Sequence, residues 1–314
     1  MIKPVASSPD EVRDAANVGK VRDLRDVADT AGETRSARPR YSLWRRLPPS
    51  GWIGAAIVAF WAAVALFGGL LSPHDSGEVI SVEVFAPLSA HSPLGSDFLG
   101  RDMLSRMLVG ARYTVGLALA AALLASITGT LLGLAAAVAA KWFDEILSRL
   151  LDGLICIPSK IFALVMVAAF GSSVGVLLLT AALTYTPGAF RIARSLAVNT
   201  VVLDYVQVAR ARGEGRLYIA CREILPNIIQ PMMADFGLRF VFIVLLLSGL
   251  SFLGLGVQPP AADLGSLVRE NISGLWDAAP AVIIPALAIA SLTIGMNLLI
   301  DNWPGAARRG AGGR

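Results

Sequence analysis

The chain has few of the residues that form metal centres and redox sites. Its 314 residues include two cysteines and two histidines. Cys156 and Cys221 form no CxxC motif, and no third type of ligand clusters near both His74 and His91. We therefore expect no disulfide framework, no metal site and no cofactor.

Charge is also scarce, and the motifs of common enzymes are missing. Charged residues make up 16% of the chain and hydrophobic residues 55%, and the mean hydropathy is +0.65. The sequence contains no GxxxxGK[ST] phosphate-binding loop, no HExxH motif and no Ser/His/Asp arrangement. We predict an integral membrane protein that is not an enzyme, has no catalytic residues and contacts lipid rather than nucleic acid.

Long apolar runs account for this composition. The hydrocarbon core of a bilayer is about 30 Å thick, so a helix needs roughly 20 apolar residues to cross it. Uncharged runs of this kind lie at 52–71, 113–140, 240–258 and 278–300. In the second run, Gly129 and Gly133 form a small-xxx-small pair, which predicts the close approach of another helix.

The middle of the chain decides the number of spans. Residues 161–190 are uncharged over a length too great for one crossing and too short for two, and GSSVG at 171–175 indicates a turn. Six spans place the arginine-rich segments in the cytoplasm and the acidic loops outside, whereas five would export two basic segments. We predict an all-α membrane protein with both termini cytoplasmic. The predicted spans are 52–71, 113–140, 151–170, 174–191, 236–258 and 278–300.

The segments outside the spans are more polar. Residues 1–41 mix charge with serine, threonine and alanine and do not resemble a signal peptide, so we expect a disordered cytosolic tail ahead of a membrane domain at 42–303. Residues 304–314 form a second short cytosolic tail. Residues 97–112 place three arginines on the outer side, and their apolar spacing predicts an interfacial helix that leads into the second span.

Two charged positions fall within predicted spans. Lys160 lies near mid-depth of the third span, where a cation costs about 2.5–3.5 kcal/mol on insertion scales. It either lines a translocation path or has a structural role, snorkelling or pairing with Asp152, and the sequence leaves both open. Asp235 and Arg239 are spaced i, i+4, which predicts an ion pair at the inner end of the fifth span.

The predicted cytoplasmic loop 192–235 contains the run VARARGEGRLYIACREILPN. Apolar residues recur at helical spacing on both sides of GEG at 213–215, which predicts two short helices meeting at a glycine turn. Gly213 or Gly215 supplies a positive φ there, and Pro226 ends or kinks what precedes it. The loop either docks a soluble partner or is a solvated segment whose arginines hold topology.

The same run, extended to VQVARARGEGRLYIACREILPN, resembles the EAA loop of ABC-importer permeases, in which an EAA triplet is followed by three residues, a glycine, nine residues and IxLP. The matching positions here are Gln207, Val208, Ala209, Gly213, Leu225 and Pro226. SPLGSDFLGRDMLSRMLVGARYTVGL at 92–117 and LSFLGLGVQPPAADLGSLV at 250–268 resemble the peptide and nickel branch, specifically its C-type subunit.

The resemblance implies a type I ABC-importer permease fold in the bacterial cytoplasmic membrane. The subunit would form half of a path for peptides or a similar small solute, together with a second permease subunit, two cytosolic ATPases and a periplasmic or lipid-anchored binding protein. The residues that it assigns to ATPase coupling are Gln207, Val208, Ala209, Arg210, Arg212, Gly213, Glu214, Leu225 and Pro226. The alternatives are a stand-alone secondary transporter and a membrane scaffold for a cytosolic partner.

Overall fold

The protein is helical wherever its structure is described. A computed structural model describes residues 48–89, 92–276 and 279–302. Within these ranges there is no strand, and the only β-type pairing is two isolated bridges near the start of the second long helix. The all-α prediction is thus confirmed for the described part. The two predicted tails, 1–41 and 304–314, lie outside it.

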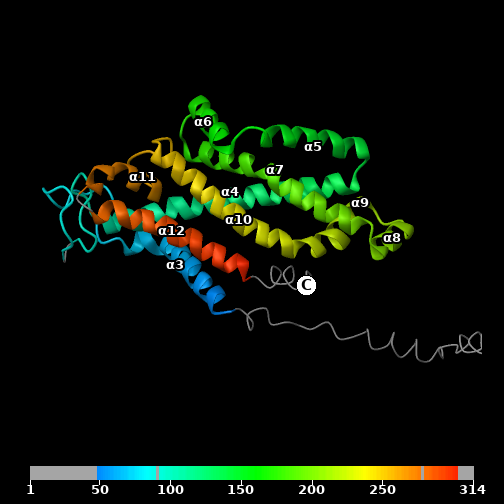
Figure 1. The fold of residues 1–314 in the computed structure, drawn as a ribbon, viewed down its shortest axis with the longest axis horizontal. Helices are drawn as coiled ribbons and strands as arrows, with labels where there is room; N and C mark the ends of the chain where they lie inside the picture. Colours follow the sequence, from blue (N-terminus) through cyan, green and yellow to red (C-terminus); the bar gives the residue numbers. More distant parts are fainter. Residues whose placement is uncertain (1–47, 90–91, 277–278, 303–314) are drawn as a thin grey trace, which may run out of the picture. The chain divides into compact units, whose positions relative to one another are not determined.

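Figure 1 shows the arrangement of the helices. They are α3 (Pro49–Leu71), α4 (Met103–Val138), α5 (Lys141–Ile155), α6 (Ser159–Phe170), α7 (Val174–Val201), α8 (Asp204–Ala211), α9 (Arg216–Tyr218), η2 (Ile219–Ile224), α10 (Leu225–Phe252), α11 (Leu264–Glu270), η3 (Ile272–Leu275) and α12 (Pro280–Asp301). Helices α3, α7, α10 and α11 all pack against α4, so α4 is the central element of the bundle.

Small residues let α4 approach α7 closely. A Cβ atom added to Gly129 would lie 2.8 Å from the backbone nitrogen of Phe190, and one added to Gly133 would lie 2.8 Å from the Cβ of Ala193. Both distances are shorter than real contacts, so the two backbones meet at these glycines. The predicted close approach at this small-xxx-small pair is confirmed.

Helices α3 and α12 are the first and last predicted spans, and they pack against each other. Trp61 donates its indole N–H to the hydroxyl of Ser291 across 2.9 Å, which satisfies a polar group in an apolar setting. Gly54 lies so close to α12 that an added Cβ would be 2.6 Å from the backbone nitrogen of Leu299. The ends of the chain's membrane domain therefore pack against each other.

The predicted third span, 151–170, is not one straight helix. It consists of the last part of α5 and all of α6, which meet at an angle of 86°. Pro158 explains the break, because it lacks an N–H and disfavours helical geometry at Ile157. Within the described residues, five helices are long and apolar enough to cross a membrane, and there are six spans if this bent pair counts as one. The count of six stays a prediction.

Three other helices extend beyond the predicted spans. Helix α4 begins at Met103, ten residues before the predicted start, and α7 continues to Val201, past the charges at Arg191 and Arg194. Arginine is itself a good helix former, and the two side chains pair with acidic residues on α5, Asp152 and Asp144. Helix α10 begins at Leu225, so the exposed part of the predicted loop 192–235 is shorter than expected.

Two of the three arginines in residues 97–112 lie in ion pairs rather than on an interfacial helix, whereas Arg112 is exposed. Arg106 lies in the first turn of α4, is 3% exposed, and contacts Asp97 at 2.6 Å and Glu270 at 2.8 Å. Arg101 contacts the same two carboxylates at 2.7 and 3.2 Å. We call these four residues the outer charge cluster. It ties the loop before α4 to α11.

Candidate functional site

Residues 204–226, which contain the EAA-like run and which we call the docking segment, begin with α8, and α8 is held to the bundle by its apolar face. Val206 and Ala209 are buried, and they pack in one cluster with Ile224 and Ile228 of the following helices. Asp204 lies in the first turn and Arg210 in the last, where each charge complements the helix dipole. The opposite face of α8 is therefore free to carry exposed polar side chains.

A Schellman motif ends α8 at the predicted glycine. Gly213 has φ +82°, its N–H donates to the carbonyl of Arg210 at 2.9 Å, and the N–H of Glu214 donates to Ala209 at 3.2 Å. Gly215 has an ordinary φ of −68°. The predicted glycine turn is confirmed, and Gly213 is the residue that supplies the positive φ.

The helix after the turn continues directly into the membrane. Residues 216–252 form one helical element in which α9 passes through the π-helical turn η2 into α10. Pro226 stands in the first turn of α10, where the wider π-helical geometry before it removes the need for a regular hydrogen bond. Pro226 does not separate the second short helix from the fifth predicted span. The turn at Gly213 thus lies directly before a helix that is long and apolar enough to cross a membrane.

The nine predicted coupling residues divide by exposure. The exposed ones are Gln207, Val208, Arg210, Arg212, Gly213 and Pro226; Glu214 and Leu225 are half-buried, and Ala209 is buried. Arg212 and Glu214 lie 3.6 Å apart, and Gln207 donates to the carbonyl of Val201 at 2.8 Å. Only part of the motif therefore faces outward.

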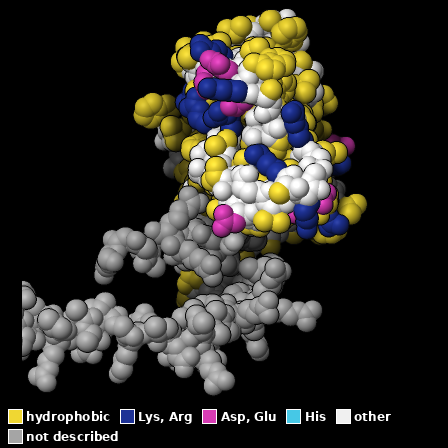
Figure 2. All heavy atoms as spheres, turned by 90° about the vertical axis from the view of Figure 1, so that its right-hand side faces the viewer, with side chains coloured by type: hydrophobic (Ala, Val, Ile, Leu, Met, Phe, Trp, Pro, Cys, Tyr) yellow, Lys and Arg dark blue, Asp and Glu magenta, His cyan; other side chains and the backbone are white. Residues whose placement is uncertain are grey.

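Basic and apolar side chains share this end of the molecule. Figure 2 shows it face on, with lysine and arginine side chains set among hydrophobic ones. Exposed arginines in the segment are Arg210, Arg212, Arg216 and Arg222. Partial desolvation and then the nearby Glu223 carboxylate raise the pKa of the Tyr205 phenol above its usual value.

Lys160 lies at the bend between α5 and α6. It is the second residue of α6, it is exposed, and no described carboxylate forms an ion pair with it. Its predicted alternative partner Asp152 instead accepts from Arg191 at 2.6 Å. The pairing of Lys160 with Asp152 is therefore not seen.

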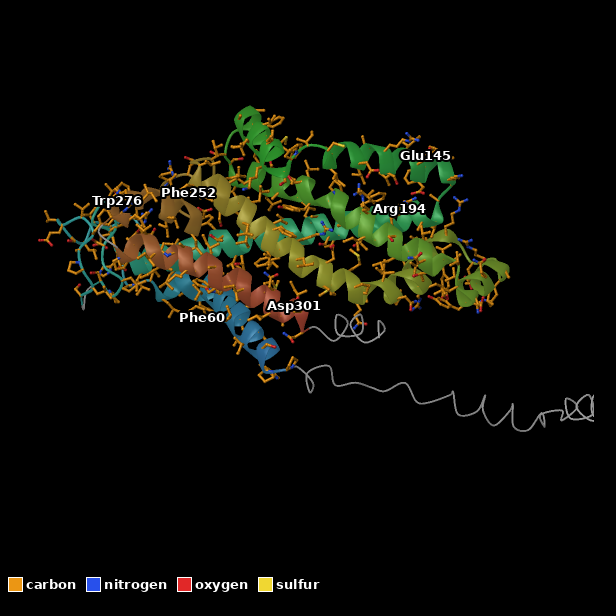
Figure 3. All side chains as sticks on the ribbon, in the orientation of Figure 1. Phe60, Glu145, Arg194, Phe252, Trp276 and Asp301 are labelled. Atoms are coloured by element: carbon orange, nitrogen blue, oxygen red, sulfur yellow. The ribbon has the colours of Figure 1, made fainter. Side chains whose placement is uncertain are left out.

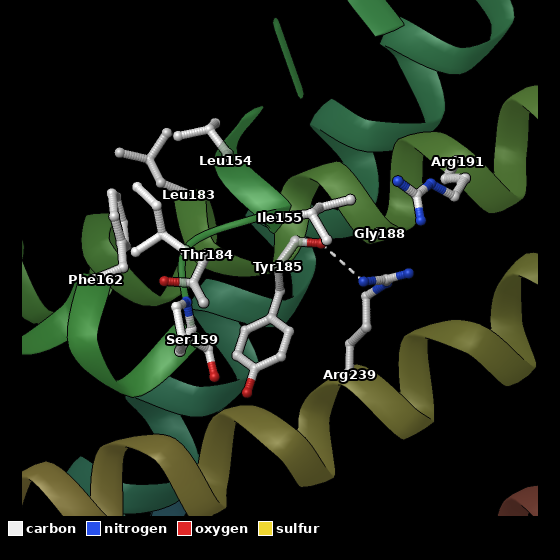
Figure 4. Close-up of a pocket in the computed structure, with 12 residues that line it drawn as sticks. Leu154, Ile155, Ser159, Phe162, Leu183, Thr184, Tyr185, Gly188, Arg191 and Arg239 are labelled. Carbon is white, nitrogen blue, oxygen red and sulfur yellow. Dashed lines mark hydrogen bonds between the residues drawn. The ribbon is translucent and has the colours of Figure 1, made fainter. Parts of the chain in front are cut away.

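A pocket of about 370 Å³ opens beside this bend (Figure 4). Tyr185 and Arg191 of α7 and Arg239 of α10 supply its main polar groups. The predicted Asp235–Arg239 pair is confirmed at 2.6 Å, and Arg239 also donates to the carbonyl of Tyr185 at 2.7 Å. The sequence analysis predicts no site role for Tyr185 or Arg191. The one available signal for Arg191 is that it follows directly on the uncharged run 161–190.

The two ends of the bundle differ in what they present. Glu145 and Arg194 lie toward the end that carries α8, whereas Phe252 and Trp276 lie toward the other end (Figure 3). Within residues 48–89, 92–276 and 279–302, no three histidine, cysteine, aspartate or glutamate side chains lie close enough together to hold a metal ion.

The chain is similar to known transport proteins over most of its length. The glutathione transport system permease protein GsiD of Pectobacterium atrosepticum is 32% identical over 267 residues, covering 84% of this chain and 88% of that protein. A putative peptide transport system permease protein of Brucella suis is 34% identical over 217 residues, covering 69% and 73%. The crystal structure of an amino acid ABC transporter with histidines aligns with 66% of this chain and 93% of that chain, at 17% identity and a TM-score of 0.47.

The family match begins at Gly129, in the last third of α4, and ends just after α12. Residues 129–304, more than half of the chain, match the family described as binding-protein-dependent transport system inner membrane component. The match includes the α8 turn and the pocket beside the bend. It confirms the resemblance to ABC-importer permeases and the location in a bacterial cytoplasmic membrane. The chain belongs to the family of inner membrane components of binding-protein-dependent transport systems.

Proposed function

We propose that this chain forms half of the translocation path of an ABC importer for short peptides or a similar small solute. The relatives named above are permease proteins for glutathione and for peptides, which supports this solute class. A second, different permease subunit would complete the path, and two cytosolic ATPases would drive it. A periplasmic or lipid-anchored binding protein would deliver the solute at the outer end.

The observation that carries this proposal is the continuity between the exposed turn and a membrane helix. A push on the turn at Gly213 acts on α9 and, through one helical element, on α10. The buried contacts of Val206 and Ala209 keep α8 attached to the same cluster, so α8 cannot fold away under load. The arrangement is suited to transmit movement of an ATPase to the helices that line the path.

The coupling residues are tested by changing the exposed charge. We expect Arg210→Glu to reduce co-purification of the ATPase by about tenfold or more, because charge reversal at an interface repels the partner and costs several kcal/mol. Co-purification from mild detergent and ATPase stimulation by the binding protein are the measurements. Arg149→Glu is the matched control, since Arg149 is exposed on α5 and lies outside the docking segment. Equal ATPase recovery in both variants would contradict the coupling role.

The turn itself is tested at Gly213. Proline holds φ near about −65° and cannot adopt the observed +82°, so we expect Gly213→Pro to abolish coupled transport while the bundle stays folded. Gly213→Ala is the milder variant, because alanine can adopt the left-handed conformation at a cost of about 1 kcal/mol. We expect this variant to retain part of the transport activity. Normal transport by the proline variant would show that this turn geometry is not needed.

Lys160 is proposed as a residue of the solute path. It is an exposed cation at the bend, next to the polar pocket, and it attracts a carboxylate-bearing solute. We expect Lys160→Met to lower the uptake of such a solute several-fold, as loss of an ionic contact does, while the ATPase still co-purifies. Uptake at the normal rate and with normal affinity would contradict this role.

A further inference from the structure

The pocket beside the α5–α6 bend, which we call the bend pocket, is built from four helices. It has a volume of about 370 Å³, within the range of roughly 300–1,000 Å³ typical of small-molecule sites. Aliphatic and aromatic side chains from the bend form one wall, and α7 and α10 form the polar wall (Figure 4). The bend pocket therefore has the mixed lining that holds an amphipathic small molecule.

One arginine in the polar wall is fixed in place. Arg239 is buried, and it donates to both carboxylate oxygens of Asp235 at 2.6 and 3.0 Å and to the carbonyl of Tyr185 at 2.7 Å. Gly188 leaves room for it, since an added Cβ there would lie 2.8 Å from Arg239 Nη1. The guanidinium has five N–H donors, so two remain after these three bonds. Its charge is balanced by Asp235.

The other arginine is held loosely. Arg191 makes one hydrogen bond, from Nη2 to Asp152 Oδ1 at 2.6 Å, among the residues that the structure describes. The two side chains are 60% and 53% exposed in the isolated chain, so neither is enclosed by the bundle. Arg191 can therefore exchange Asp152 for another carboxylate and keep an ionic contact.

The charge around the bend pocket is unbalanced. Two cations, Arg191 and Arg239, line the pocket and are paired with Asp152 and Asp235. Lys160, one residue after the lining Ser159, adds a cation that forms no ion pair in the described structure. The excess of one positive charge beside a partly apolar cavity favours an anion that carries an organic body. Arginine pairs especially well with a carboxylate because its fork matches the two oxygens.

We infer that the bend pocket binds the carboxylate of a small solute, which displaces Asp152 from Arg191 while Arg239 stays paired with Asp235. This inference rests on the proposed importer function and names the chemical class that it selects. When no solute is present, the carboxylate of Asp152 pairs with Arg191 in its place. Binding exchanges one carboxylate for another at Arg191 and changes no covalent bond and no protonation state.

The test measures binding of radiolabelled dialanine to the purified permease–ATPase complex in detergent, without the binding protein. Arg191→Gln should weaken binding about tenfold, the loss of one charge-assisted contact, and Asp152→Asn should strengthen it by a factor of about three to ten. The C-terminal amide of dialanine should not compete. Arg194→Gln is the matched control, because Arg194 pairs with Asp144 across the same two helices and does not line the pocket.

Three results of the dialanine assay would overturn the inference. These are no dialanine binding by the intact complex, equal binding by the parent and both pocket variants, and equal competition by the amide. A lipid phosphate has similar chemistry, so the same variants are also assayed with phosphatidylglycerol nanodiscs. Altered lipid binding with unchanged dialanine binding would assign the arginines to a headgroup and likewise overturn it. Absence of a co-purifying ATPase would instead count against the importer function, so the two failures are distinguishable.

Discussion

Gly129→Leu is expected to prevent the bundle from assembling. The glycine lies where α4 meets the backbone of α7 at Phe190, and even a single added carbon would have to displace that backbone. Overpacking a close contact costs about 1–3 kcal/mol and more when only backbone can move, and leucine adds three further carbons. We expect little monodisperse protein after detergent extraction and a lower thermal transition in what remains.

The same helix offers a matched control. Gly116 is exposed on α4, and an added Cβ there meets no atom within 4 Å. Gly116→Leu should therefore yield normal amounts of folded chain. If Gly129→Leu gave as much monodisperse protein as Gly116→Leu, the close packing of α4 on α7 would not be what holds these helices together.

Arg106→Ala is expected to have the second-largest effect. Without Arg106, the two carboxylates of Asp97 and Glu270 share a single cationic partner, Arg101. Asp97 is fully buried, so water cannot replace the lost partner. Breaking a buried ion pair by removing one partner costs about 3–5 kcal/mol, because the remaining charge has lost its compensation without regaining water. The loop before α4 should then detach from α11, which we expect to see as faster proteolysis at the outer end and a lower thermal transition.

An exposed ion pair supplies the comparison for the outer charge cluster. Arg149 and Glu145 lie 2.9 Å apart on α5 with 78% and 57% of their side chains exposed. Arg149→Ala should change stability by less than about 0.5 kcal/mol, as solvated i, i+4 pairs do. Similar thermal transitions for Arg106→Ala and Arg149→Ala would mean that the cluster is hydrated and does not secure the outer loop.

The docking segment was largely predictable because its signals are local. Helical spacing, a glycine and a proline within about twenty residues indicate helix, turn and helix, and the turn at Gly213 follows them. The continuation of this segment into α10 could not be predicted from local signals. Pro226 usually ends a helix, but here the π-helical turn before it lets the chain continue into α10.

The bend pocket was not predictable, since its arginines acquire their setting from distant residues. Arg191 and Asp152 are 39 positions apart, and Arg239 meets Tyr185 across 54. The sequence predicts only that Arg191 ends a span and that Arg239 pairs with the nearby Asp235. Only the packing of α5, α7 and α10 around the bend brings these groups to one cavity.

The sequence by itself determined that this protein is an all-α membrane protein, which segments are apolar enough to cross, and which family its motifs resemble. These follow from hydropathy and short-range spacing, since the cost of placing charge in hydrocarbon acts on each residue separately. The tertiary structure alone decided which charges are neutralised, that α7 is the helix that meets Gly129 and Gly133, and that 151–170 bends at Pro158. Those features depend on contacts between residues far apart in the chain, and neither hydropathy nor local spacing carries that information.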